Sequence, residues 1–248
     1  MRPRIASEIW KNTVIFTIAQ ALNGAGTQLL VALGALTILH LTESLFMAGL
    51  AVTILQGSRL LISYPLGKLA DAYGRKPAMG VGLSLSIAGC PLLVASVTFN
   101  SLGLFILGTL VFGMGIGAAQ QLRVAIADMY PPEKRGRALG FLLTGSLLGA
   151  LAGSIILLGT ERLAGSLQID NLALPWMALP ILTLIALLLV LQVKPDPKQI
   201  GLNLELYWPN QVEIAPVENN GPHLGLRTFV KSRTLMKAAA CFAPAQGV

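Results

Sequence analysis

The chain has 248 residues, of which 54% are hydrophobic and only 12% are charged, and its mean hydropathy is +0.70. Because soluble domains carry about 25% charged residues, this composition excludes a water-exposed globular surface. The net charge of +7 does not indicate a nucleic-acid partner, because the basic residues form short clusters between long apolar runs. The two cysteines lack metal-ligand spacing, so we expect no metal site, and no motif indicates a cofactor.

Six segments are long and apolar enough to cross the hydrocarbon core of a bilayer, which takes about 20 helical residues. They lie at 12–39, at 44–66 with one interruption at Arg59, in two parts of the uncharged run 77–122 separated by a polar turn at 98–101, at 138–160 and at 171–193. The sequence therefore predicts an all-α membrane protein with a six-helix transmembrane bundle over residues 12–193.

The segments that flank this bundle differ in composition. Residues 1–11 form a short basic N-terminus, and residues 194–233 contain five prolines and no helical period, which predicts a central linker. Residues 234–248 resemble the start of a seventh helix, but the final apolar stretch from Ala238 to Val248 is too short to span. We therefore expect this sequence to be part of a longer chain.

The distribution of basic residues predicts the orientation of the bundle. Nearly all of the 18 Lys and Arg residues fall on one side of the predicted spans, whereas Arg162 alone falls in a loop on the other side. Basic loops remain on the cytoplasmic side of a membrane. We therefore expect a multi-pass protein of a bacterial-type inner membrane with its N-terminus and linker in the cytoplasm.

Two loops carry the motifs that indicate a family. Between the second and third spans the sequence reads Gly67-Lys68-Leu69-Ala70-Asp71-Ala72-Tyr73-Gly74-Arg75-Lys76, and between the fourth and fifth spans it reads Ala127-Asp128-Met129-Tyr130-Pro131-Pro132-Glu133-Lys134-Arg135-Gly136-Arg137. Both loops resemble signature loops of the Major Facilitator Superfamily, and the resemblance covers residues 10–195. It implies the N-terminal six-helix half of a secondary transporter, which works by alternating access and is not an enzyme.

The resemblance also implies partners and a role for the loops. The partners are a small-molecule substrate, with or without a coupling proton, the lipid bilayer, and a second six-helix half or a second chain. A charge network would latch the outward-facing state, and the residues that match this latch motif are Gly67, Asp71, Gly74, Arg75, Lys76, Asp128 and Arg135. The alternative is that the basic residues are only surface anchors.

Helical spacing adds two expectations that do not depend on the family. Gly67 would let another helix approach closely, and Asp71 lies one turn further on the same face. Glycines at four-residue intervals predict further close-packing faces, with Gly113 and Gly117 in the fourth span and Gly145, Gly149 and Gly153 in the fifth. The fifth span resembles the motif of the family's antiporters only in part, because the Gly-Pro step is absent. Proton-coupled efflux of hydrophobic drug-like compounds is therefore an alternative and not the main prediction.

Polar residues inside the spans mark either a cavity or an interface between helices. The candidate substrate-cavity residues are Gln20, Asn23, Thr27 and Gln28 on one face of the first span, Gln56 and Arg59 in the second, and Gln120 at the end of the fourth. The alternative for the uncharged residues is hydrogen bonding between helices. For Arg59 it is snorkelling toward the membrane surface near Lys68.

The sequence bears on three other functions. An intramembrane enzyme needs a nucleophile and a base, but the only histidines are His40, at the end of the first span, and His223, in the linker. An ATP-driven pump needs a phosphate-binding loop, and the sequence contains none. A truncated six-helix remnant or scaffold that transports nothing without a partner half is the main alternative to a transporter.

Overall fold

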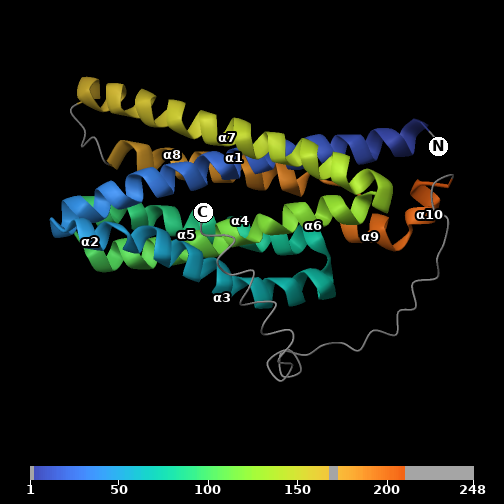
Figure 1. Cartoon of the computed structure of the whole chain (residues 1–248), viewed down its shortest axis with the longest axis horizontal. Helices are drawn as coiled ribbons and strands as arrows, with labels where there is room; N and C mark the ends of the chain where they lie inside the picture. The colour runs from blue at the N-terminus through green and yellow to red at the C-terminus, as the bar shows by residue number, and fades with distance from the viewer. Residues whose placement is uncertain (1–2, 168–172, 210–248) are drawn as a thin grey trace. The chain divides into compact units, whose positions relative to one another are not determined.

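The computed structural model describes residues 3–167 and 173–209, which lie within one of the chain's two compact units, Met1–Val212. Every regular element in these ranges is a helix, as the sequence predicted (Figure 1). In chain order they are α1 (Pro3–Thr42), α2 (Leu45–Ala48), α3 (Leu50–Tyr73), α4 (Arg75–Thr98), α5 (Leu102–Ala118), α6 (Gln120–Met129), α7 (Pro132–Leu167), α8 (Ala173–Leu191), α9 (Pro197–Leu202) and α10 (Leu204–Tyr207).

Six segments of the described chain are long and apolar enough to cross a membrane. They are Ser7–Thr42, Phe46–Tyr73, Arg75–Thr98, Leu102–Met129, Pro132–Thr160 and Leu174–Leu191. Each overlaps one predicted span, so the prediction of six transmembrane helices is confirmed. The polar turn at 98–101 separates α4 from α5, because Asn100 adopts a φ of 47° and the Ser101 hydroxyl caps α5 by accepting from the N–H of Leu104.

The helices extend further than the uncharged runs from which they were predicted. α1 begins at Pro3 rather than near residue 12, and α3 continues to Tyr73, so Asp71 lies within a helix and not in a loop. An uncharged run measures the thickness of the hydrocarbon core, whereas a helix can continue into the headgroup region with charged side chains on it. Both motif segments therefore lie at the ends of helices.

The start of the predicted linker is also helical, which corrects the expectation of a segment without helical period. α9 has Asp196 as its N-cap and Pro197 at its first position, where a proline starts a helix rather than breaking it. Ile200 and Trp208 are buried in the core of the bundle. The rest of the linker and the predicted start of a seventh helix at 234–248 lie outside the described residues.

Glycines allow the closest contacts between helices. α1 runs along α7 and α8, and α5 packs against α3 and α4 (Figure 1). A Cβ built on Gly145, Gly149 or Gly153 of α7 would lie less than 3.0 Å from a backbone oxygen of α1. These oxygens belong to Thr17, Ala21 and Ala25, which are also four residues apart. The predicted close-packing face of α7 is thus the face that contacts α1.

The glycines of α5 face α3 in the same way. A Cβ on Gly113 would collide with the hydroxyl of Ser58, and one on Gly117 would lie 2.8 Å from Cγ2 of Ile62.

One cluster of buried apolar side chains includes Phe16 and Met129, and another includes Phe105 and Trp176. We call the end of the bundle that carries the α3–α4 junction, the α6–α7 junction and α9 the basic end.

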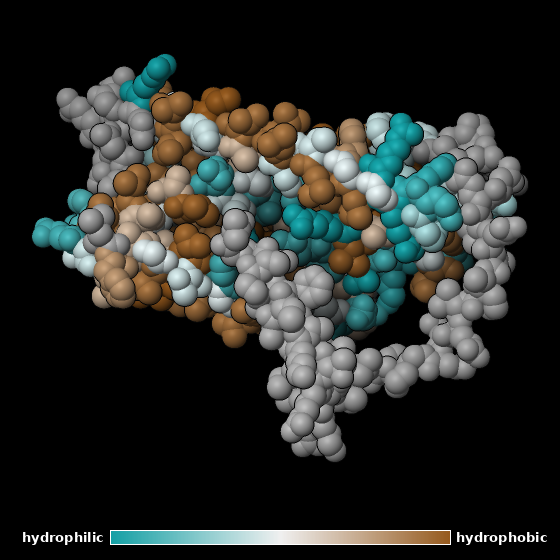
Figure 2. All heavy atoms as spheres, viewed as in Figure 1, coloured by the Kyte–Doolittle hydropathy of each residue, from teal (hydrophilic) through white to brown (hydrophobic). Residues whose placement is uncertain are grey.

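The outside of the bundle is largely apolar. Figure 2 shows hydrophobic side chains over much of the visible face, and hydrophilic ones gathered at its middle and toward the basic end. The exposed apolar side chains of α7 include Leu147, Leu148, Leu151 and Ile155. Contact with hydrocarbon or with another apolar surface explains this exposure.

Candidate functional site

The candidate site is built around a sharp junction between α3 and α4. Gly74 ends α3 with a φ of 108° and a ψ of 168°, a conformation that glycine adopts readily and other residues rarely do. α4 then starts at Arg75 without any connecting loop. The helix therefore breaks between Asp71 and Arg75, yet the reversal of the chain still brings their side chains together.

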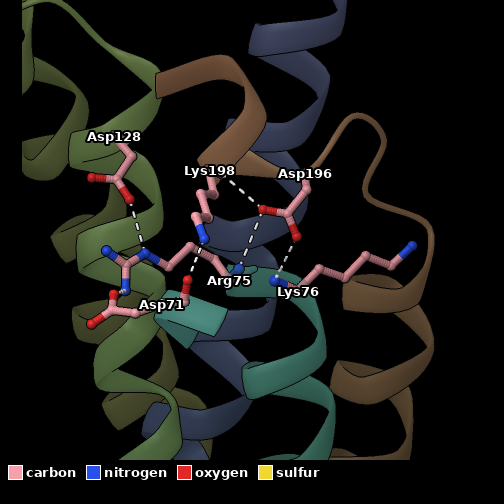
Figure 3. A network of polar contacts seen from close by, with 6 residues as sticks. All are labelled: Asp71, Arg75, Lys76, Asp128, Asp196 and Lys198. Carbon is pink, nitrogen blue, oxygen red and sulfur yellow. Dashed lines mark hydrogen bonds and ion pairs between the residues drawn. The ribbon is translucent and has the colours of Figure 1, made fainter. Parts of the chain in front are cut away.

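The guanidinium of Arg75 lies between two carboxylates (Figure 3). Its Nε donates to Oδ2 of Asp128 at 2.9 Å, and its Nη1 lies 3.4 Å from Oδ1 of Asp71. The Arg75 side chain is 17% exposed, that of Asp128 30% and that of Asp71 76%. Water screens the pair with Asp71 more strongly, so the pair with Asp128 is the stronger contact. The three residues come from α4, α6 and α3.

Asp196 completes this network, and sequence reasoning missed it. Its carboxylate accepts hydrogen bonds from the backbone N–H groups of Arg75 at 3.2 Å, Lys76 at 3.0 Å and Lys198 at 2.8 Å (Figure 3). It therefore caps the N-termini of α4 and α9 together, where a negative charge is favourable. The pair Asp196-Pro197 is a recognisable helix start in the sequence, but nothing there shows the contact with α4.

Further hydrogen bonds connect the end of α8 to this junction. Lys76 Nζ donates to the carbonyl of Val193 at 3.1 Å. Lys198 Nζ donates to the carbonyl of Asp71, as Figure 3 shows. Asn12 of α1 donates to the carbonyl of Lys194 at 3.3 Å. Lys76 thus has a specific partner and is more than a surface anchor. We call Asp71, Arg75, Lys76, Asp128, Asp196 and Lys198 the charge network.

Two residues of the predicted latch motif do not join the charge network. A Cβ built on Gly67 would have no neighbouring atom within 4 Å, so no described helix makes the close approach expected there. Arg135 is exposed, and its Nε donates to the carbonyl of Tyr130 at 3.0 Å, within the turn between α6 and α7. In this structure its described contact stabilises that turn.

The polar residues of α1 do not form one open stripe. Gln20 is buried, and its Nε2 donates to Oγ of Ser146 on α7 at 2.7 Å, so it bonds two helices. Thr27 donates to the carbonyl of Asn23 in its own helix. Asn23 lines a cavity of about 10 Å³ beside α4, which is too small for a solute. Gln28, in contrast, is exposed.

The candidate residues of α3 and α6 leave polar groups open to a ligand. Nη1 of Arg59 donates to Oε1 of Gln56 at 2.8 Å, one turn earlier in α3 and away from Lys68. This contact does not support snorkelling toward the basic end. Nε of Arg59 is buried without a partner among the described residues, while Gln56 and Gln120 are exposed. A buried donor without a partner is costly, so it favours a ligand or water at this position.

The α3–α4 junction gives a direct prediction about stability. Replacing Gly74 by alanine is expected to lower the free energy of unfolding by about 1–3 kcal/mol, because of the positive φ. The added Cβ would also lie 2.8 Å from Oδ2 of Asp196. The measurement is the unfolding midpoint of the purified protein in detergent. Gly80→Ala in α4 is the control, since its Cβ would meet no atom within 4 Å. Equal midpoints for the two variants would contradict the prediction.

The six-helix bundle and its charge network define a multi-pass integral membrane protein. The family model of the Major Facilitator Superfamily matches residues 16–246. The chain therefore belongs to the Major Facilitator Superfamily, which is a class of transporters and not of enzymes.

Several relatives are themselves transporters by name. The chain is 28% identical over 196 residues to the riboflavin transporter RfnT of Brucella anthropi, which covers 77% of the chain and 48% of the relative. It is 34% identical over 155 residues to the multi-drug resistance efflux pump PmrA of Streptococcus pneumoniae. This match covers 59% of the chain and 37% of PmrA. It is 24% identical over 197 residues to the uncharacterised MFS-type transporter YddS of Bacillus subtilis, covering 79% and 45%.

A solved structure shows the same fold. The inward-open conformation of the xylose transporter XylE from E. coli superposes with a TM-score of 0.62 at 17% identity, over 82% of this chain and 53% of XylE. The chain likewise spans about half the length of the curated relatives that match most of it.

Proposed function

We propose that this sequence is the N-terminal half of a secondary transporter, which moves a small solute across a membrane by alternating access. The second half is a further six-helix bundle, supplied by the same polypeptide or by a second chain. The basic end faces the cytoplasm of a bacterial-type inner membrane, with the N-terminus on that side. The coverage of about half of YddS and about half of RfnT supports the division into halves.

The observation that carries this proposal is the charge network at the basic end. It joins α3, α4, α6 and α9 through Asp71, Arg75, Asp128 and Asp196, so we expect these elements to move as one unit. Alternating access rocks one such rigid half against the other. A network that holds the helices of one half together fits this motion, because each half keeps its own helix contacts while the contacts between the halves change.

The open polar groups support a neutral or anionic solute. Arg59 provides a cation with a donor that has no partner in the described part of the chain, beside the exposed amide of Gln56. No Asp or Glu lies near the middle of a described span, so the proposal includes no proton carrier in this half. The resemblance to the drug efflux pump PmrA favours hydrophobic compounds as the second candidate class.

Transport by the complete native polypeptide in proteoliposomes tests this proposal. A panel of radiolabelled neutral and anionic solutes and of fluorescent hydrophobic drugs is assayed by counterflow. Exchange of at least one class above protein-free vesicles supports a transporter. No exchange of any compound by folded, correctly inserted protein would contradict the proposal and favour the hypothesis of a scaffold that does not transport.

Arg59→Gln separates the two solute classes. For an anionic or polar solute the variant is expected to raise KM about tenfold, since a hydrogen bond to a charged group is lost. For a hydrophobic drug it is expected to leave KM nearly unchanged. Lys68→Gln is the control, because Lys68 is exposed near the basic end and lies over the ring of Tyr64. An equal rise of KM in both variants would show that the overall positive charge of the protein is responsible. Arg59 would then not be a solute contact.

A further inference from the structure

A second feature of the basic end lies outside the charge network. A groove of about 810 Å³ opens between the start of α1, the start of α7 and Trp208 after α10. Its walls are mainly apolar and aromatic, and its charged groups are Lys134 and Arg137. Among the described residues, no acidic side chain lines it.

Ring contacts hold the walls of the groove in place. Trp10 of α1 is 56% exposed, and its ring centroid lies 5.2 Å from that of Phe141 on α7. On the opposite side, Trp208 donates from Nε1 to the carbonyl of Met129 at 3.1 Å, and Lys134 Nζ lies 4.5 Å from the centre of its ring. The aromatic ring therefore holds the cation at the groove.

The polar groups in the groove wall are satisfied within the protein. The Tyr130 hydroxyl lies 2.8 Å from Oγ1 of Thr13, which donates its own proton to the carbonyl of Ile9, so Tyr130 is the donor. Burial raises the pKa of the Tyr130 phenol, which keeps it neutral at physiological pH. The described lining of the groove therefore carries a net positive charge.

We propose that this groove binds an anionic phospholipid, with its phosphate at Lys134 and Arg137 and an acyl chain along Trp10 and Phe141. The two cations lie three residues apart, on one face of α7. The apolar spans Ser7–Thr42 and Pro132–Thr160 both begin within a few residues of the groove lining at Trp10 and Lys134. The groove thus lies where lipid phosphates meet hydrocarbon.

The combination of charge and apolar wall selects a lipid over other occupants. A soluble anion would use the two cations but would leave the aromatic wall exposed to water. An apolar partner helix would cover the wall but would not compensate the two cations. An anionic phospholipid uses both. This site is independent of the solute path proposed above, so either proposal can fail alone.

Native mass spectrometry of the complete native polypeptide tests the site. The protein in detergent is titrated with phosphatidylglycerol or phosphatidylcholine of equal chain length. We expect tighter binding of phosphatidylglycerol, and about a 10- to 30-fold loss of that preference in Lys134→Gln/Arg137→Gln. Glutamine keeps much of each side-chain stem in place while removing the charge. Size-exclusion profiles identify any misfolded variant.

A matched control removes the same charge elsewhere at this end. Lys68→Gln/Lys194→Gln changes two exposed lysines that do not line the groove, and should retain the preference. Equal losses in the two double variants, or no preference in the unchanged protein, would overturn the proposal. Displacement of the lipid by millimolar glycerol phosphate would also overturn it, because it would identify a soluble-anion site. Phe141→Ser should weaken lipid binding without changing the charge.

Discussion

Replacing Gly149 by alanine is expected to destabilise the bundle by about 1–3 kcal/mol, because an added methyl group has no room there. Its Cβ would lie closer to the backbone oxygen of Ala21 than side-chain carbons approach in proteins. That oxygen belongs to α1 and cannot rotate away as a side chain can. The two helices would have to separate, which also disturbs the neighbouring contacts of Gly145 and Gly153.

The same substitution at Gly159 is the matched control and should have the opposite sign. Gly159 lies in the same helix, is exposed, and has no atom within 4 Å of an added Cβ. Alanine is the better helix former by about 0.5–1 kcal/mol, so Gly159→Ala should stabilise slightly. The midpoint of thermal unfolding, followed by tryptophan fluorescence in detergent, distinguishes the two. A Gly149→Ala protein as stable as the Gly159→Ala protein would rule out the close contact with α1.

Removing the Arg75–Asp128 pair is expected to have the second large effect on the free energy of unfolding. A double-mutant cycle of Arg75→Ala and Asp128→Ala should give a coupling of about 1–2 kcal/mol, because both groups are largely shielded and share a charged hydrogen bond. The corresponding cycle with Asp71→Ala should give less than about 0.5 kcal/mol, because the Asp71 carboxylate is exposed and its contact is longer.

The same variants connect the charge network to transport. If the network stabilises one state of an alternating-access cycle, Asp128→Ala should change the rate of solute exchange and the accessibility of engineered cysteines at the basic end. The double-mutant cycle measures stability, whereas cysteine accessibility measures how the protein is distributed between its conformational states. A coupling for Asp71 equal to that for Asp128 would show that exposure does not decide the strength of these pairs.

The outline of the fold was predictable because charge is costly in hydrocarbon wherever it lies along the chain. The runs between charged residues located all six spans, and the turn before Leu102 was visible from the polar residues Thr98, Asn100 and Ser101. Helix ends were not predictable in this way, since water permits a charged helix to continue. This is why α1 and α3 extend beyond their expected ends, and why α9 was missed within a proline-rich segment.

The candidate site was only partly predictable. Asp71, Arg75 and Asp128 were identified from motifs, and the structure brings these three together. Arg135 and Gly67 belong to the same motifs but make no contact with them among the described residues. Of the polar residues on α1, Gln20 proved to bond α7. A helical face can be read from spacing, but which neighbour covers that face cannot.

The sequence by itself determined that this protein is an all-α membrane protein of six spans with one basic end, because hydrophobicity and charge are local properties of each segment. Only the tertiary structure decided that Asp196 caps α4 from a position about 120 residues further along the chain. It also decided that Arg75 pairs more closely with Asp128 than with Asp71. Such contacts depend on how whole helices lie against one another, which is set by packing over many residues.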